Sequence, residues 1–318
     1  MVFRGKETMK KTLAICIPTY NRAALLAKNL KVLVPLAQAS ACPIYISDNA
    51  SPDDTEKIVA EVKKKYDRIH YVRQHENIGF CRNFEYVVNM AEADYVWLLG
   101  DDDYIVEGCI EKVLCDFKAH EDACMVVVNA GDNPASIRIK DLKSQVICGK
   151  DAIMSEIGAH MTWMSCLVFN KNVFSSVQFH QYEGNAFPHL WWILANLKEQ
   201  SKIYWESDSC ISSFGGGHQM SDFFKVFFAD WHDAVYRVEG YSESARKKCF
   251  NAGVAYAFTG RELVKLRAKG ALNKSTWQED RAYFEQLPDD KQKLIKLLLM
   301  VPESVCKAAI GMYKGLKG

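Results

Sequence analysis

Three consecutive carboxylates, Asp101, Asp102 and Asp103, follow a short apolar run that begins at Tyr95. An apolar run bounded by a glycine is typical of a strand buried on both faces of a parallel sheet. Adjacent carboxylates repel one another unless a cation or hydrogen-bond donors offset their charge. Hard divalent ions such as Mg²⁺ and Mn²⁺ prefer oxygen ligands and often share them with a phosphate. The triplet therefore indicates either a metal site for a phosphorylated substrate or a solvated acidic turn.

Three further polar clusters each follow a predicted strand. They comprise residues 18–22, 48–49 and 77–83. Because the carboxyl ends of parallel strands meet at one edge of a sheet, where ligands bind in open α/β folds, these clusters are expected to lie near the acids. Loops are polar in general, so a single cluster would mean little. Four clusters at one edge would supply acceptors for a base and a ribose, donors for phosphates and ligands for a metal.

Strands and helices are predicted to alternate through the first third of the chain, which favours βαβ units and a mainly parallel sheet flanked by helices. Ser51 is a good helix cap and Pro52 fits a first helical position, so the second helix is expected to begin there. A short strand over 203–205 is expected at a sheet edge. The other strands are expected at residues 13–17, 44–47, 69–72, 95–99, 125–128 and 165–169.

From residue 222 onward the pattern is helical. We therefore expect an α/β catalytic domain over 1–221 and a helical C-terminal region over 222–318. Lysines surround apolar residues from Lys291 to Lys317, a composition that suits a helix lying on an anionic membrane surface. The alternative is a helix packed on the catalytic domain with its lysines in water.

Composition excludes several function classes. The net charge of +1 gives no global positive field, so nucleic acid is not expected as a partner. The eleven cysteines are scattered without a C-x-x-C pair, and most lie in apolar runs. This predicts reduced core thiols in a cytoplasmic protein rather than disulfides or a zinc site. No apolar run approaches the length of a membrane span, and the polar N-terminus lacks a signal-peptide core.

Taken together, the four clusters resemble the family 2 glycosyltransferases of the GT-A fold. The similarity is dense over residues 12–112, and the last motif is most similar to an abequosyltransferase-like branch that builds bacterial surface polysaccharides. The motifs, in chain order, are Pro18-Thr-Tyr-Asn-Arg22, Ser47-Asp-Asn-Ala-Ser-Pro-Asp-Asp-Thr55, Asn77-Ile-Gly-Phe-Cys-Arg-Asn83 and Leu99-Gly-Asp-Asp-Asp103.

The resemblance implies a role for each cluster. Asp48 is expected to contact the nucleobase or ribose, the alternative being a residue that only caps a turn. Asp101 and Asp103 are expected to form the D-x-D pair that binds Mn²⁺ or Mg²⁺, with Asp103 nearest the metal, and Asp102 to take part in catalysis. Asp101 is also expected to contact the nucleotide. The other expected nucleotide contacts are Pro18, Thr19, Asn21, Asn77, Gly79, Asn83 and His218.

His218 belongs to a glycine-rich loop over 215–221. The family often carries a histidine in a similar late loop, so His218 is expected to contact the diphosphate or the metal. The alternative is a flexible linker into the helical region. Trp163, Trp191 and Trp192 are more typical of packing than of sugar platforms, although they lie where the family binds its acceptor.

The catalytic base is where this sequence departs from the family. Family 2 enzymes, which are mostly inverting, usually supply an Asp from a Glu-Asp pair just before a helix that contains Leu-Trp. Here Leu190 and Trp191 are present, but the acidic pair is not. His189 directly precedes them and Glu183 lies upstream, so His189 is expected to take the proton, with Glu183 as the second candidate. Alternatively, His189 only packs among nearby aromatic residues.

The resulting expectation is a metal-dependent transferase that moves a sugar from a nucleotide diphosphate donor to a saccharide or lipid-linked saccharide acceptor. It is placed in the cytoplasm or peripherally on the inner face of the membrane. The main alternative is a non-catalytic sugar-nucleotide or glycan-binding protein on a decayed transferase fold, which has little need for an intact acid triplet. A receiver-like Mg²⁺ domain is disfavoured by the chain length and by the lack of a suitable lysine at a later strand end.

Overall fold

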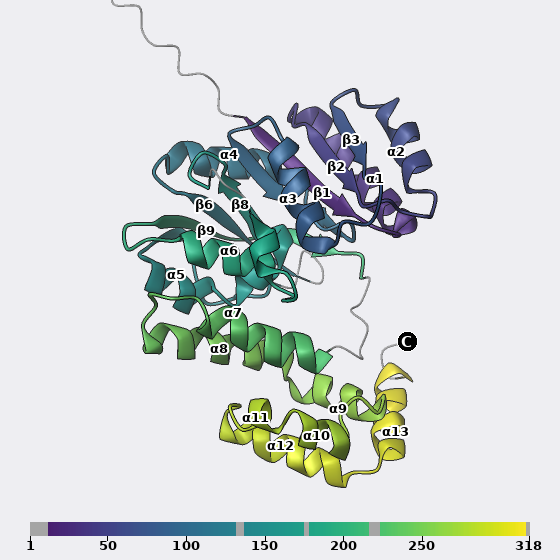
Figure 1. Cartoon of the computed structure of the whole chain (residues 1–318), viewed down its shortest axis with the longest axis vertical. Coiled ribbons are helices and arrows are strands. Elements are labelled where there is room, and N and C mark those ends of the chain that lie inside the picture. The colour runs from purple at the N-terminus through teal and green to yellow at the C-terminus, as the bar shows by residue number, and fades with distance from the viewer. Residues whose placement is uncertain (1–11, 132–136, 175–177, 216–222, 316–318) are drawn as a thin grey trace, which may run out of the picture. The chain divides into compact units, whose positions relative to one another are not determined.

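The computed structural model describes residues 12–131, 137–174, 178–215 and 223–315 (Figure 1). The described residues fall into two compact units. The first draws on Met1–Lys150, His160–Glu183 and Asn196–Gly216, and the second on Asp151–Ala159, Gly184–Ala195 and Gly217–Gly318. The predicted boundary at residues 221 and 222 falls outside the described part of the chain and stays a prediction.

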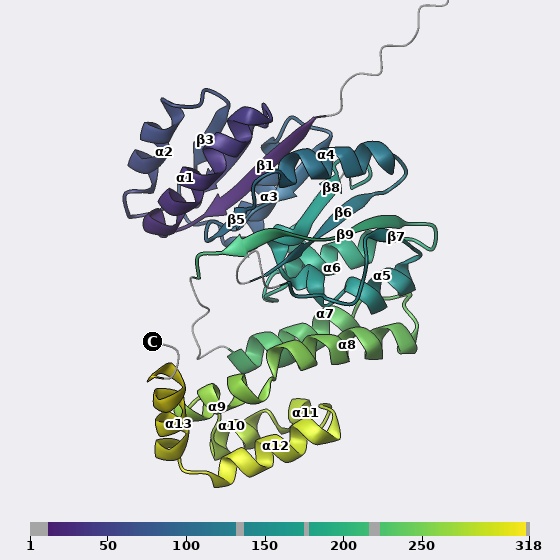
Figure 2. The ribbon, with the colours of Figure 1, turned by 180° about the vertical axis from the view of Figure 1, so that it is seen from behind.

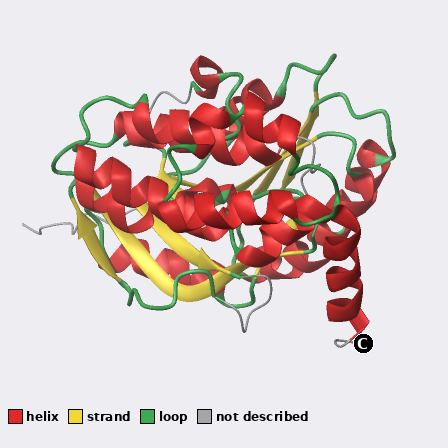
Figure 3. Cartoon of the chain, turned by 90° about the horizontal axis from the view of Figure 1, so that it is seen from below, coloured by secondary structure: helices red, strands yellow, loops and turns green. Residues whose placement is uncertain are grey.

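The first unit contains a nine-stranded sheet with the order β3-β2-β1-β4-β8-β6-β9-β5, and β7 pairs with β9. Figure 3 shows its strands in yellow and the helices in red. The strands are β1 Leu13–Thr19, β2 Ile44–Asp48, β3 Ile69–Arg73, β4 Tyr95–Leu98, β5 Asp103–Ile105, β6 Met125–Ala130, β7 Gln145–Cys148, β8 Leu167–Asn170 and β9 Lys202–Ser213.

The sheet is mixed, because its two halves are built differently. β1 pairs in parallel with β2 and β4, and β2 pairs in parallel with β3, as the alternation of strands and helices predicted. In the second half, β8 is antiparallel to both β4 and β6, and β9 is antiparallel to β5 and β7 but parallel to β6. The predicted α/β class is confirmed, but the parallel part is smaller than expected, since antiparallel strands need no crossover helix.

Four amphipathic helices follow the strands of the first half. Apolar residues at helical spacing bury one face of each helix; in α3, for example, Phe84, Val87 and Val88 are buried. Short 3₁₀ segments cover His160–Thr162, Met164–Cys166 and Phe179–Tyr182. The helices are α1 Ala23–Ala39, α2 Thr55–Lys63, α3 Phe80–Met90 and α4 Cys109–Ala119.

The start of α2 differs from the prediction. The helix begins at Thr55, and Ser51 does not cap it. Ser51 Oγ instead accepts the backbone N–H of Asn21 at 2.9 Å, and Asp53 Oδ1 accepts the backbone N–H of Thr55 at 3.2 Å. Ser51 therefore holds the loop after β1 rather than the helix, a contact between segments that local capping rules do not foresee.

The predicted strand over 203–205 is present, but its predicted place at the sheet edge is wrong, because these residues pair with β6 on one side and β7 on the other. β9 is twelve residues long and pairs with β6, β5 and β7. Its far end pairs with β5, a short strand that was not predicted, and brings Asp103 opposite Ser213. The third carboxylate of the triplet is thus the first residue of a strand and not part of a loop.

The second unit is built from helices (Figure 2), so the predicted helical character of the C-terminal region is confirmed. Aromatic rings pack together in it, with ring centroids of Phe228 and Phe258 4.4 Å apart. No helix within the described ranges is both long and apolar enough to cross a bilayer. The remaining helices are α5 Lys150–Ile157, α6 Pro188–Asn196, a π-helical segment Lys225–Asp230, α7 Trp231–Tyr236, α8 Glu243–Ala257, α9 Gly260–Ala268, α10 Lys274–Glu279, α11 Arg281–Phe284, α12 Asp289–Met300 and α13 Glu303–Gly315.

Candidate active site

The four polar clusters contact one another at one edge of the sheet. Thr19 Oγ1 donates a hydrogen bond of 2.8 Å to Oδ2 of Asp101. Thr19 lies opposite Asp48 in the register of β1 and β2, and its carbonyl accepts the Asn49 N–H at 3.0 Å. Asn83 Nδ2, from the third cluster, lies 3.5 Å from the same carbonyl. The predicted meeting of the clusters at this edge is therefore confirmed.

Asp48 is fully buried, and its two carboxylate oxygens bind different partners. Its Oδ1 accepts the Ser51 N–H at 2.9 Å, so it does hold a turn. Its Oδ2 accepts a hydrogen bond of 2.7 Å from the Tyr71 hydroxyl and lies 3.8 Å from Arg73 Nε. Burial, followed by the hydrogen bond to Asp48, raises the pKa of Tyr71 above its ordinary range, so this phenol stays a donor. A carboxylate has about four acceptor positions, and these contacts do not use all of them.

Most of the expected nucleotide contacts surround these residues. Pro18 is buried in β1, and Asn21 adopts a left-handed backbone with a φ of 53°. Asn77 Oδ1 accepts the Gly79 N–H at 2.9 Å and Asn49 Nδ2 at 2.8 Å, which ties the loop before α3 to the end of β2. Their roles toward a nucleotide stay predictions.

An ion pair links the acid triplet to the loop after β1. Arg22 Nη1 lies 2.8 Å from Oδ1 of Asp101, and its Nη2 lies 2.8 Å from Oδ2 of Asp102. Asp101 is buried, whereas about a quarter of the Asp102 side chain is exposed. One guanidinium thus neutralises part of the charge of two adjacent carboxylates.

Asp103 is held by neutral donors. Its Oδ2 accepts hydrogen bonds from Trp163 Nε1 at 2.7 Å and from Ser165 Oγ at 2.5 Å. Ser165 Oγ in turn accepts the Gly100 N–H at 2.9 Å. Because Asp101 and Asp103 are both buried, the alternative of a solvated acidic turn is wrong for these two residues.

Burial shifts the titration of both acids. It raises the pKa of Asp101 to about 6, although Arg22 and the hydrogen bond from Thr19 act in the opposite direction. It also raises the pKa of Asp103 to about 6 against the hydrogen bonds from Ser165 and Trp163. Carboxylates that lose water in this way gain stability from a nearby cation, a pattern that is common at functional sites.

The donor set fits a divalent cation that shares its ligands with a substrate. Within the described ranges, no group of three or more His, Cys, Asp or Glu side chains is arranged to hold a metal by itself. Mg²⁺, however, is usually bound through one or two carboxylates plus substrate phosphates and water. Asp101 and Asp103 offer oxygen ligands of that kind at the ligand-binding edge of the sheet.

The candidates for the catalytic base lie in different units. Glu183, in the first unit, has a half-exposed side chain whose Oε1 lies 3.0 Å from Arg82 Nε. His189, in the second unit, is buried as the second residue of α6, and its ring centroid lies 6.5 Å from that of Phe187. Pro188 opens this helix, as predicted. His218 lies outside the described residues.

Four side chains of the site were not predicted as partners of the acids: Trp163, which was expected to pack or to bind a sugar, and Arg22, Tyr71 and Ser165. Arg22 stands within the first motif, and its charge next to a predicted strand end was the available signal. Tyr71 lies in the middle of β3, and its position in the sequence gives little sign of its bond to Asp48. Ser165 is separated from Asp103 by sixty-two residues, and no local pattern connects them.

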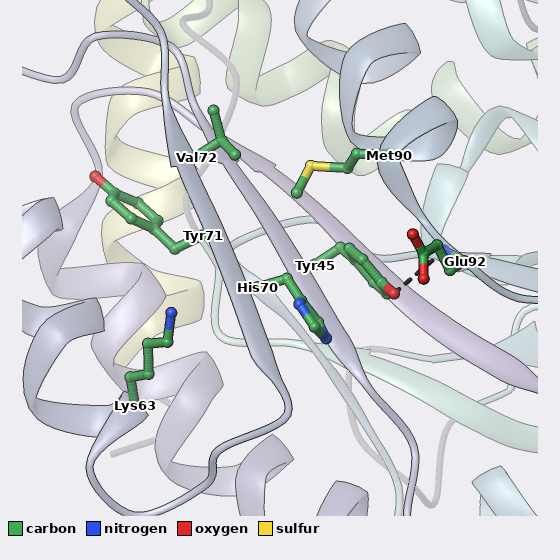
Figure 4. A pocket seen from close by; sticks show the side chains of 7 residues that line it. All are labelled: Tyr45, Lys63, His70, Tyr71, Val72, Met90 and Glu92. Carbon is green, nitrogen blue, oxygen red and sulfur yellow. Dashed lines mark hydrogen bonds between the residues drawn. The ribbon is translucent and has the colours of Figure 1, made fainter.

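A pocket lies beside β3, away from the acids (Figure 4). In this view Tyr71 and Lys63 lie on one side of the strand, and Tyr45 and His70 lie on the other, where their rings stack with centroids 4.5 Å apart. None of the predicted site residues lines it. Among the residues that line the pocket, Tyr71 contacts the site through the hydrogen bond from its hydroxyl to Asp48.

Two bacterial proteins share sequence similarity with the chain. It is 28% identical over 200 residues to abequosyltransferase RfbV of Salmonella typhimurium, which covers 56% of this chain and 59% of the relative. It is also 28% identical over 200 residues to a GalNAc(5)-diNAcBac-PP-undecaprenol beta-1,3-glucosyltransferase of Campylobacter jejuni, which covers 60% of this chain and 61% of the relative. The matches thus span about three fifths of the length of these relatives.

Solved structures share the fold. TarS 1–349 of S. aureus in complex with UDP-GlcNAc superposes with a TM-score of 0.60 and 12% identity over 89% of this chain and 83% of that chain. The mannosyltransferase PcManGT of Pyrobaculum calidifontis in complex with GDP-Man and Mn²⁺ superposes with a TM-score of 0.53 and 12% identity over 96% of this chain and 88% of that chain. At such low identity the likeness shows the fold alone, and it confirms the predicted GT-A-like architecture.

The part of the sequence that runs from β1 to β8 matches a family model described as glycosyl transferase family 2. The match extends over residues 14–178, more than half of the chain, and includes all four polar clusters. The chain therefore belongs to glycosyl transferase family 2.

Proposed function

We propose that this protein is a glycosyltransferase that moves a sugar from a nucleoside diphosphate donor to a saccharide or lipid-linked saccharide acceptor in bacterial surface polysaccharide synthesis. The observation that supports this proposal best is the direct contact between the end of β1 and the acid triplet, through Thr19 and Asp101, on the edge that also carries Asp48. Acceptors for a base and ligands for a diphosphate-bound cation thus lie at one edge, where α/β folds bind nucleotides.

Asp48 is proposed to accept a hydrogen bond from the base or ribose, and Asp101 and Asp103 to hold Mn²⁺ or Mg²⁺. Such an ion, when bound, screens the diphosphate as negative charge builds on the leaving group. PcManGT, which shares the fold, was solved with GDP-Man and Mn²⁺. Hydrogen bonds from Trp163 and Ser165 orient Asp103, so the carboxylate is positioned before a ligand arrives.

The acceptor hydroxyl must lose a proton as its oxygen attacks the sugar. For an inverting transfer, we assign the role of proton acceptor to the His189 imidazole, with Glu183 as the second candidate. A position at the start of α6 favours the neutral, proton-accepting form of an imidazole, since a helix N-terminus disfavours positive charge. Asp102 is proposed to act with the metal-binding acids, and His218 to contact the diphosphate.

A membrane contact is proposed through the C-terminal helices. Apolar side chains on α12 and α13 are exposed, with fractions of 54% for Leu297, 75% for Met300, 54% for Val305 and 66% for Met312. Lys293, Lys296 and Lys307 are exposed on the same helices, which fits anionic lipid headgroups. A lipid-linked acceptor would be reached from such a surface, and the Campylobacter relative is named for an undecaprenol-linked substrate.

A donor screen tests the activity. UDP-, GDP-, CDP- and dTDP-sugars are incubated with the protein and Mn²⁺ or with EDTA, and both sugar release to water and thermal stabilisation are measured. A transferase is expected to hydrolyse at least one donor slowly in a Mn²⁺-dependent way, and Asp103→Asn is expected to lower this hydrolysis strongly. Metal-dependent stabilisation without any turnover, even with acceptor added, would instead assign the chain to the non-catalytic binding proteins.

A further inference from the structure

Arg22 is the one basic side chain among the described residues that forms an ion pair with the acid triplet. Its two terminal nitrogens contact different carboxylates, those of Asp101 and Asp102, each at 2.8 Å. Asp103 receives its hydrogen bonds from the neutral donors Trp163 and Ser165. The guanidinium therefore occupies one oxygen of a proposed metal ligand, Asp101, while the other proposed ligand does not depend on it.

The backbone that carries Arg22 is held on both sides. The Asn21 N–H donates to Ser51 Oγ at 2.9 Å, and the Ala23 N–H donates to Asp53 Oδ2 at 2.8 Å. Asn21 also turns the chain through a left-handed conformation directly before Arg22. Because the main chain is fixed in this way, a change in the partner of the guanidinium requires only rotation of its side chain, 36% of which is exposed to solvent.

The ion pair between Arg22 and the acid triplet offsets only part of the negative charge of the triplet. Three ionised carboxylates carry three negative charges, and Arg22 supplies one positive charge, which leaves two negative charges. A divalent cation balances this remainder. A donor diphosphate then adds negative charge at the same edge, and a guanidinium fork matches phosphate oxygens as well as it matches carboxylates.

We propose that Arg22 is an exchangeable counter-ion, which releases Asp101 when a divalent cation binds and turns to the donor diphosphate. The inference rests on the proposed function. It makes metal and diphosphate binding energetically coupled: the cation competes with Arg22 when alone, and the diphosphate removes this competition by offering the guanidinium another partner. Such coupling is reciprocal, so the metal strengthens diphosphate binding by the same factor.

The test compares Mn²⁺ affinities by calorimetry at about pH 8, where carboxylates of this kind are ionised. Arg22→Gln removes the competing charge, and Arg281→Gln, which breaks the exposed pair with Glu285 in the helical unit, is the control. Without nucleotide, Arg22→Gln is expected to bind Mn²⁺ roughly tenfold more tightly than the wild type, within the usual range of coupling between sites. Addition of UDP or GDP should improve Mn²⁺ affinity less in Arg22→Gln than in the wild type and Arg281→Gln.

Equal or weaker Mn²⁺ binding by folded Arg22→Gln without nucleotide would overturn the exchange while leaving the proposed function intact. A wild type that binds no Mn²⁺ with any nucleoside diphosphate would overturn both. A second measurement uses the wild type, in which the charge of Arg22 is kept. Its Arg22 Nε–H resonance, assigned by NMR from its absence in Arg22→Lys, is followed during titration with Mg²⁺. It is expected to shift as Mg²⁺ saturates the site, and an unchanged resonance at saturation would refute the exchange.

Discussion

The indole Nε1–H of Trp163 donates a hydrogen bond of 2.7 Å to Oδ2 of Asp103. A tryptophan that resembled a packing residue or a sugar platform thus positions a carboxylate in the candidate site. Ser165, the middle residue of the 3₁₀ segment that follows Trp163, donates to the same oxygen. Buried carboxylates are stable only with such donors, so the segment before β8 and the acid triplet form one structural unit.

Asp103→Asn is expected to lower donor hydrolysis by roughly 10²–10³-fold and to weaken Mn²⁺-dependent donor binding, because it removes a negatively charged oxygen ligand. The fold should persist, since an amide oxygen still accepts from Trp163 and Ser165. Kinetics and melting curves are compared with Asp122→Asn, an exposed acid paired with Lys202. Full activity in folded Asp103→Asn would remove the metal role.

Ser165→Ala is expected to destabilise the protein by about 1–3 kcal/mol, because the Gly100 N–H loses its acceptor and Asp103 loses a donor. Donor hydrolysis should fall as well. Ser212→Ala is a matched control, since Ser212 is equally buried and its hydroxyl has no hydrogen-bond partner among the residues that the structure describes. Denaturant unfolding measures both changes, and equal effects of the two substitutions would contradict the positioning role.

His189→Ala is expected to lower kcat for transfer to the true acceptor by roughly 10²–10⁴-fold, as the loss of a general base does, with little change in donor hydrolysis if water needs no base. Glu183→Gln breaks the pair with Arg82 and should have a small effect. Near-normal kcat in His189→Ala together with a loss in Glu183→Gln would pass the role to Glu183. If neither substitution matters, the base is a different residue.

Vesicles containing anionic phosphatidylglycerol should carry the wild type upward in flotation, and neutral vesicles should carry it less. The triple substitution Leu297→Gln, Met300→Gln and Val305→Thr removes exposed apolar groups and is expected to abolish flotation. These point changes spare Ile295 and Leu298, which α12 buries, and therefore leave the helix packed. Val173→Thr, at another exposed apolar position, is the control, and equal flotation of all variants would refute the membrane contact.

His160 makes stability depend on pH. Burial, followed by the charge of Arg138, lowers the pKa of His160 from 6.5 to about 3. Below pH 6.5 the unfolded imidazole binds a proton that the folded one does not, so stability present above pH 6.5 is lost as the pH falls.

Its Nε2–H donates to the Val128 carbonyl at 2.9 Å, and His160→Gln can keep a donor there. The slope of unfolding free energy against pH should fall by up to about 1.4 kcal/mol per pH unit between pH 4 and 6.5 in this variant. Urea titrations at several pH values measure it, with the exposed His75→Gln as control. An unchanged slope in His160→Gln would show that this imidazole is not kept neutral.

Local patterns were sufficient for the first half of the sheet. The runs that became β1, β2 and β4 are apolar because those strands are buried, and the polar residues directly after them had to lie at the carboxyl edge. The convergence of Thr19, Asp48 and Asp101 follows from this parallel register. Residue periodicity and strand order therefore determined where a site would be and which acids it would contain.

Tertiary structure alone decided how those acids are stabilised. Arg22 contacts Asp102, 80 residues away in the sequence, and Trp163 contacts Asp103, 60 residues away. Ser51, which was predicted to cap a helix, accepts a hydrogen bond from the backbone of Asn21. Hydrogen bonds and ion pairs act over about 3 Å and carry no periodicity, so the partner of a polar side chain depends on which segments the folded sheet brings together. Hydrophobic periodicity is a property of each segment, whereas charge compensation at this site is a property of the assembled fold.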